Sequence, residues 1–108
     1  MDSQNVRDLI LKGLKKYTSD NPVKSSVIEK ALNISGVTLR EEIHYLRTVC
    51  NEPIGSNKKG YFYARSEKDL EHFYTTMLSR ARHIHSAAEG AMTRFRTKTD
   101  GKNTPSLF

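Results

Sequence analysis

Tryptophan is absent from the sequence, and Cys50 is its single cysteine. One thiol cannot build an intrachain disulfide framework, and it cannot supply a cysteine-based zinc site. Both exclusions are typical of a protein from a reducing compartment, so we expect a cytoplasmic location. Because no catalytic partner pattern accompanies Cys50, we expect its thiol to be inert and partly buried.

Long apolar runs are also missing. No window approaches the roughly 20 apolar residues that a membrane-spanning helix needs, and we therefore expect no membrane partner. The opening segment, MDSQNVRDLI, contains no basic stretch followed by an apolar run. We accordingly predict no signal peptide.

Motifs that carry catalysis or hold a cofactor are not found. The sequence contains no P-loop, no dinucleotide-binding fingerprint and no nuclease-like cluster of carboxylates. His83 and His85 invite a metal site, but they would lie about 200° apart on a helix and could not chelate one ion together. We therefore expect no catalytic residue, no metal site and no cofactor, and we predict that the protein is not an enzyme.

Positive charge is what the sequence has in excess. Lysine and arginine number 18 against 12 acidic residues, which gives a formal net charge of +6. Such a balance favours polyanionic partners through long-range attraction and counterion release, and it would attract an anionic membrane as well. With 36% hydrophobic residues among 108, the chain can bury one small core and carry an appendage.

Apolar residues recur at helical spacing in three segments, 2–17, 26–32 and 36–49. A short oxygen-bearing side chain near the start of each segment can satisfy an unpaired backbone N–H group. The predicted capping residues are Asp2 or Ser3, Ser26 with Glu29, and Ser35. The predicted core residues are Leu9, Ile10, Leu14, Ile28, Leu32, Leu39, Ile43 and Leu46. Val27, Val37 and Val49 belong to the same apolar sets.

Two β-prone pieces follow the third helical segment and flank a Gly-Ser-Asn-Lys-Lys-Gly tip, which predicts a hairpin within residues 51–64. Val23 and Lys24 can form a further, very short strand. The aromatic run 61–63 leaves open whether a ring faces a ligand, although we favour Tyr61 as an anchor for the hairpin. The resulting class is mainly α (α+β), with a small three-helix core and a two-stranded hairpin.

This order of elements predicts a winged helix-turn-helix, in which one face of the third helix packs on the core and the other enters the major groove of DNA. The hairpin then lies beside that helix and can reach phosphates or the minor groove. The candidate DNA-binding residues on the helix are Ser35, Gly36, Thr38, Arg40, Glu41, His44 and Arg47. Those on the hairpin are Ser56, Asn57, Lys58 and Lys59. Either set is also compatible with a solvated surface, because mixed-charge helix faces and polar turns are common.

The segments SGVTLREEIHYLR (35–47), PIG (53–55) and KGY (59–61) carry a more specific signal. They resemble the N-terminal winged helix domain of the biotin-repressor type over roughly residues 5–64. The whole chain is also similar to small DNA-binding proteins of phages and prophages of Gram-positive bacteria. The resemblance implies a sequence-specific binder of double-stranded DNA, acting as a transcriptional regulator or an origin binder in the bacterial cytoplasm. No ligase domain follows the hairpin here, so the resemblance implies no biotin chemistry.

A long helix is predicted over residues 67–95, and its apolar residues follow a spacing of three and four that is typical of a coiled-coil seam. Because an apolar seam is unfavourable in water, we expect a homodimer through this helix. The predicted dimerisation residues are Leu70, Phe73, Tyr74, Met77, Ala81, Ile84 and Ala88. The predicted divisions are residues 1–65 (DNA binding), 66–95 (the long helix) and 96–108 (a disordered basic tail).

An alternative function is a protein-interaction module, in which the long helix docks on a host or phage protein of the replication or transcription machinery. The acidic pair Glu41 and Glu42 favours this alternative, since carboxylates are awkward beside phosphates. The long helix can also lie on its own domain instead of pairing with a second copy. The basic segment 80–102, with six basic and two acidic residues, can touch flanking DNA or serve only as a solubilising end.

Overall fold

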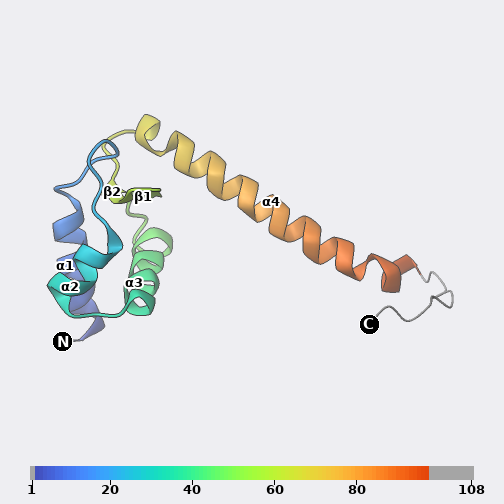
Figure 1. Ribbon diagram of the computed structural model, residues 1–108, viewed down its shortest axis with the longest axis horizontal. Coiled ribbons are helices and arrows are strands. Elements are labelled where there is room, and N and C mark those ends of the chain that lie inside the picture. Colours follow the sequence, from blue (N-terminus) through green and yellow to red (C-terminus); the bar gives the residue numbers. More distant parts are fainter. Residues whose placement is uncertain (1, 98–108) are drawn as a thin grey trace. The chain divides into compact units, whose positions relative to one another are not determined.

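A computed structural model describes residues 2–97 of the chain. The elements occur in the order α1 (Ser3–Leu14), α2 (Ser25–Leu32), α3 (Gly36–Thr48), β1 (Ile54–Asn57), β2 (Gly60–Tyr63) and α4 (Glu67–Thr97) (Figure 1). The described chain is therefore mainly helical with one two-stranded antiparallel sheet, in agreement with the predicted α+β class. It divides into two compact units, Met1–Tyr74 and Thr75–Phe108.

The core belongs to the first unit and lies between α1, α3 and the hairpin. Its buried cluster consists of Val6, Ile10, Leu14, Val23, Leu39, Ile43, Leu46 and Ile54. Five of the predicted core residues are in this cluster, but Ile28 and Leu32 are only partly buried and Leu9 is 39% exposed. The prediction was wrong for Leu9 because α1 and α2 leave an open groove between them, which Leu9 lines.

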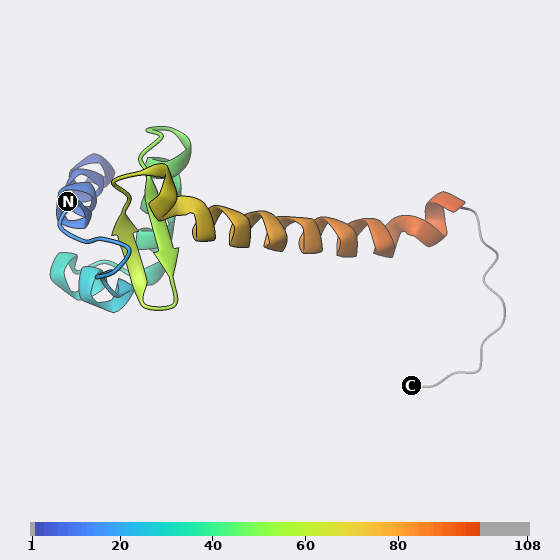
Figure 2. The same ribbon diagram turned by 90° about the horizontal axis from the view of Figure 1, so that it is seen from above.

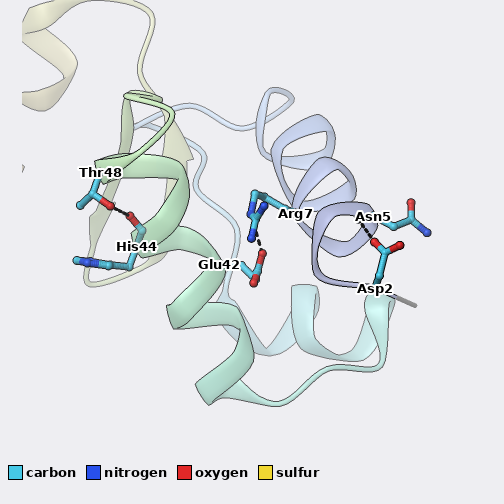
Figure 3. Close-up of polar contacts among 6 residues, drawn as sticks. All are labelled: Asp2, Asn5, Arg7, Glu42, His44 and Thr48. Atoms are coloured by element: carbon cyan, nitrogen blue, oxygen red, sulfur yellow. Dashed lines mark hydrogen bonds and ion pairs between the residues drawn. The ribbon is translucent and has the colours of Figure 1, made fainter.

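Two of the three predicted helix caps are present in the structure. The Asp2 carboxylate accepts a hydrogen bond from Asn5 N at 2.9 Å (Figure 3), and Ser35 Oγ accepts one from Thr38 N at 3.1 Å. The predicted capping box at Ser26 was wrong, because α2 begins one residue earlier, at Ser25, and its N-cap residue makes no side-chain capping bond. Ser26 therefore lies inside the first turn, where its hydroxyl is not at the capping position.

The hairpin pairs Ile54 with Tyr63 and Asn57 with Gly60, and the turn consists of Lys58 and Lys59. Figure 2 shows the two strands side by side. The short strand predicted at residues 23–24 is present as a single antiparallel bridge, in which Val23 and Tyr61 exchange two backbone hydrogen bonds of 2.8 Å. This bridge ties the connection between α1 and α2 to the edge of β2 that does not pair with β1.

The aromatic run of β2 anchors the hairpin. Phe62 is buried, and Tyr61 and Tyr63 pack against the core cluster. The prediction that Tyr61 serves as an anchor is thereby confirmed. Gly55 lies across from Phe62, and a Cβ at residue 55 would meet the ring at 3.0 Å or less. The absence of a side chain at Gly55 therefore makes room for the Phe62 ring.

The helix α4 begins at Glu67, as predicted, and continues to Thr97, two residues beyond the predicted end. Asp69 stabilises its start by accepting a hydrogen bond from Arg65 N at 2.8 Å. The prediction of a disordered tail was wrong for residues 96 and 97, which are helical, and its remainder lies outside the described residues. Among residues 2–97, no helix is long and apolar enough to cross a membrane.

Candidate nucleic-acid interface

The helix α3 has one buried and one exposed face. Leu39, Ile43 and Leu46 are almost fully buried in the core, whereas Arg40, Glu41 and His44 are exposed. Figure 3 shows His44 pointing away from α1. We refer to Val37, Arg40, Glu41, His44 and Thr48 as the outward face. Their spacing of three, four, seven and eleven residues places them on one side of the helix.

Glu42 does not belong to the outward face. It is only 8% exposed and accepts a hydrogen bond at 2.9 Å from Nε of Arg7, which lies on α1 (Figure 3). The Arg7 guanidinium also stacks over the Tyr45 ring at 3.6 Å from the ring centroid. The acidic pair in the sequence is therefore one structural ion pair between helices and one exposed carboxylate, Glu41. The main support for the alternative function is reduced accordingly.

Arg47, a candidate for DNA contact, is half-buried and engaged in contacts within the first unit. Its Nε donates to the Ile54 carbonyl oxygen at 2.8 Å, and its guanidinium lies 4.7 Å from the Phe73 ring centroid and 5.9 Å from that of Tyr61. Burial lowers the pKa of Arg47, an effect that the nearby Tyr61 partly opposes. Arg47 thus holds the root of the hairpin and the first turns of α4 against α3, and we remove it from the candidate interface.

Val37 and Thr48 are members of the outward face that the sequence analysis did not select. Val37 was assigned to the apolar set of α3, but it is 56% exposed. Its spacing from Arg40, Glu41 and His44 was the available signal, because residues three, four and seven apart share one side of a helix. Val49 was also assigned to the apolar set of α3, but it follows the last residue of the helix and is exposed.

The residues at the start of α3 shape the helix terminus. Ser35 Oγ accepts from Thr38 N, and it also bonds Thr38 Oγ1 at 3.1 Å, so both side chains are engaged with each other. A Cβ at Gly36 would lie 3.3 Å from Nη1 of Arg40 and 3.5 Å from Oε1 of Glu29. Gly36 therefore leaves space beside the Arg40 guanidinium. Ser35, Gly36 and Thr38 thus shape the start of α3, and the two hydroxyl groups are already hydrogen-bonded to each other.

At the hairpin tip, two candidates are structural and two are exposed cations. Asn57 Oδ1 accepts from Lys59 N at 2.8 Å, and its Nδ2 donates to the Ser19 carbonyl oxygen at 3.4 Å, so its side chain closes the turn. Ser56 is half-buried opposite Tyr61. Lys58 and Lys59 are exposed, and neither forms an ion pair with another of residues 2–97.

Lys24 is a third cation at the hairpin that the sequence analysis did not select. It is exposed, and the bridge between Val23 and Tyr61 holds it beside Gly60. The predicted strand at residues 23–24 was the signal that could have found it. We refer to Lys24, Lys58 and Lys59 as the hairpin lysines. Asp20, an exposed carboxylate in the neighbouring connection, partly offsets their charge.

The described residues contain no group of three or more His, Cys, Asp or Glu side chains that could hold a metal ion. Cys50 is exposed, which corrects the expectation of a partly buried thiol: it follows the end of α3, outside the core. No protein-family model matches the chain, and no curated protein or solved structure was found to match it.

Proposed function

We propose that the protein binds double-stranded DNA with sequence specificity as a winged helix-turn-helix protein. The observation that carries the proposal is the outward face of α3, where Arg40, Glu41 and His44 are exposed while the opposite face of the helix is packed in the core. In a winged helix, a helix braced in this way enters the major groove, and the following hairpin is the wing. The order α1, bridge, α2, α3, hairpin supports this topology.

The chemistry of the outward face suits base edges. The Arg40 guanidinium can pair with O6 and N7 of guanine, and the Glu41 carboxylate can accept from the amino group of cytosine. Val37 offers an apolar surface to a thymine methyl group. The hairpin lysines supply charge for the phosphates, which bind the duplex regardless of its sequence. A helix with Glu41 at its centre is less suited to binding DNA without sequence preference.

We expect Arg40→Ala to relax the sequence preference. Loss of a bidentate pair with a base lowers the free energy that discriminates the preferred site from other sites by about 1–3 kcal/mol. The affinity for a random duplex should fall by no more than the loss of one phosphate contact would cause. The measurement is selection of bound sequences from random duplexes, followed by gel shifts over a salt series. Lys12→Ala on α1 is the control, because it removes one exposed charge away from α3. Absence of duplex binding by the natural chain even at low salt would contradict the proposal.

We further propose that α4 pairs with a second copy of the chain. A single helix cannot cover its own apolar side, and Met77, Ile84 and Phe95 are exposed, with Ile84 at 71%. Leu70, Tyr74, Met77, Ala81, Ile84, Ala88, Ala91 and Phe95 follow one another at alternating intervals of four and three. This is the spacing of a coiled-coil seam. Phe73 leaves the predicted set, because it packs on Arg47 within the first unit.

Ile84→Lys is expected to convert a dimer into a monomer, since it places a charge in the middle of the seam. Ser86→Lys is the matched control: it adds the same charge two residues away, about 200° around the helix. Analytical ultracentrifugation gives the mass of each variant. Equal masses for Ile84→Lys and the natural chain would exclude pairing through this face. If the dimer reads two half-sites, the duplexes selected by the natural chain should contain an inverted repeat.

The biological context proposed for this activity is transcriptional regulation or origin binding in the cytoplasm of a phage-carrying bacterium. This part depends on two resemblances: that of roughly residues 5–64 to the biotin-repressor type of winged helix, and that of the whole chain to small DNA-binding proteins of phages and prophages. The proposal invokes no cofactor and no catalytic residue, because side chains and phosphates suffice for the binding described.

A further inference from the structure

A groove of about 160 Å³ opens between α1 and α2 in the first unit. Leu9 and Gly13 line it from α1, Tyr17 lines it from the connection after α1, and Val27 and Ala31 line it from α2. The lining is almost entirely apolar. A cavity of about 150 Å³ with apolar walls is large enough for a benzene molecule. The groove can therefore take one large apolar side chain, such as a leucine or a phenylalanine.

The groove opens at the surface, and the core residues Ile10, Leu14 and Val23 form part of its floor. No residue of α2 is buried, and Val27 is 51% exposed. A Cβ at Gly13 would meet nothing within 4 Å, so the wall contributed by α1 has open space in front of it. Removal of apolar surface from water contributes about 25 cal/mol of favourable free energy per Å². A partner that covers the groove would gain this free energy.

Lysines border this apolar surface. Lys12 lies three residues after Leu9 on α1, and Lys30 lies three residues after Val27 on α2, so each is next to a lining residue on its own helix. Lys16 lies in the turn that follows α1, directly before the lining residue Tyr17. All three are exposed, and none forms an ion pair with another of residues 2–97. Two carboxylates lie near the same border: Asp8 is four residues before Lys12, and Glu29 is three residues before the lining residue Leu32. They offset part of the charge of the three lysines, and the border keeps an excess of positive charge.

We propose that the groove binds an acidic amphipathic helix from a partner protein. One apolar residue of that helix enters the groove between Leu9 and Val27, and its carboxylates face Lys12, Lys16 and Lys30. Helices commonly bind in this way, with apolar residues at intervals of three and four inserted into a groove. The proposal concerns a surface separate from the outward face of α3 and the hairpin lysines, so it does not depend on DNA binding.

Charge argues against a second copy of this chain as the occupant. Its α4 offers the apolar seam that could enter the groove, but residues 75–97 carry four arginines and one glutamate. This part of α4, with a net charge of +3, would be repelled by a border of lysines. An acidic helix meets the same border with favourable charge, which decides between the two occupants.

The test uses the full chain and a synthetic peptide of about 16 residues, long enough to form a helix on binding. The peptide carries leucine and phenylalanine at intervals of three and four and glutamate elsewhere. A second peptide has lysine in place of every glutamate. Fluorescence anisotropy measures binding, and amide chemical shifts locate it. We expect only the acidic peptide to bind, with the largest shifts at Leu9, Val27 and Ala31.

Gly13→Leu fills the groove without a clash at its Cβ and should weaken binding of the acidic peptide about tenfold or more. Lys12→Glu, Lys16→Glu and Lys30→Glu should each weaken it roughly threefold. Lys68→Glu, on α4, is the matched control and should have no effect. Circular dichroism verifies that every variant folds, and Gly13→Ala provides a second variant that leaves the groove open.

Three results would overturn the proposal. They are equal binding of the acidic and basic peptides, unchanged binding by folded Gly13→Leu, and the largest chemical shifts outside the groove. A lower mass of Gly13→Leu in the ultracentrifuge would instead mean that a second copy occupies the groove, which also contradicts the acidic partner. Because DNA is absent from all of these measurements, their failure is distinguishable from failure of the proposed DNA-binding function.

Discussion

Gly60→Ala is expected to detach the hairpin from the connection between α1 and α2 and to lower the free energy of unfolding of the protein by about 3 kcal/mol. Two effects act together at this residue. Gly60 has a φ of 144°, which side-chain-bearing residues rarely adopt. A Cβ there would also lie 2.9 Å from Lys24 N and closer still to the Val23 carbonyl oxygen. Relief of that clash requires loss of the bridge between Val23 and Tyr61.

Thermal or urea denaturation followed by circular dichroism measures this effect. Gly13→Ala is the matched control, because its Cβ meets nothing within 4 Å and alanine favours the helix interior by roughly 0.5–1 kcal/mol over glycine. The two substitutions add the same methyl group and should change stability in opposite directions. Equal stability of Gly60→Ala and the natural chain would show that the hairpin is not held to the α1–α2 connection in solution.

Replacing all three hairpin lysines by alanine is expected to weaken binding to every duplex, by roughly a hundredfold at low salt. Each phosphate contact contributes about −0.9 to the slope of log affinity against log salt concentration. Loss of three contacts should therefore flatten the slope by about 2–3 units. Sequence preference should persist, because phosphate contacts position the protein and base contacts specify the site.

The control is Lys12→Ala, Lys15→Ala and Lys68→Ala in one chain, which removes the same charge from α1, its C-terminal cap and α4. Affinities and salt slopes come from gel shifts or anisotropy with one preferred and one random duplex. If both triple variants flatten the slope equally, only the net charge of the protein matters and the hairpin is not the wing. Lys24→Ala alone should account for about one unit of the change.

The third helix illustrates what local sequence can predict. Ser35 caps it, and the spacing of Leu39, Ile43 and Leu46 identifies its buried face, so both its start and its orientation toward the core follow from neighbouring residues. The hairpin was predictable for the same reason, because Asn, Lys and Gly between two β-prone segments favour a tight turn. In each case the determining interactions join residues a few positions apart.

The roles of Glu42 and Arg47 could not be predicted in this way. A charged residue on a helix is exposed in most proteins, but Glu42 pairs with Arg7, 35 positions earlier, and Arg47 stacks on Phe73 in another helix. These partners come together only when α1 and α3 share one core and the first turns of α4 lie against Arg47. Leu9 is the reverse case: its helical spacing indicates burial, but α2 does not approach α1 closely enough to cover it.

By itself, the sequence determined where the helices and the hairpin lie and which side of α3 is apolar, because caps, turns and hydrophobic spacing act over short distances. Tertiary structure decided which charges remain available to a ligand. It paired Glu42 and buried Arg47, and it brought Lys24 to the hairpin and left the groove between α1 and α2 open. The physical reason is that the exposure of a side chain depends on which elements pack against it, which spacing along one helix does not specify.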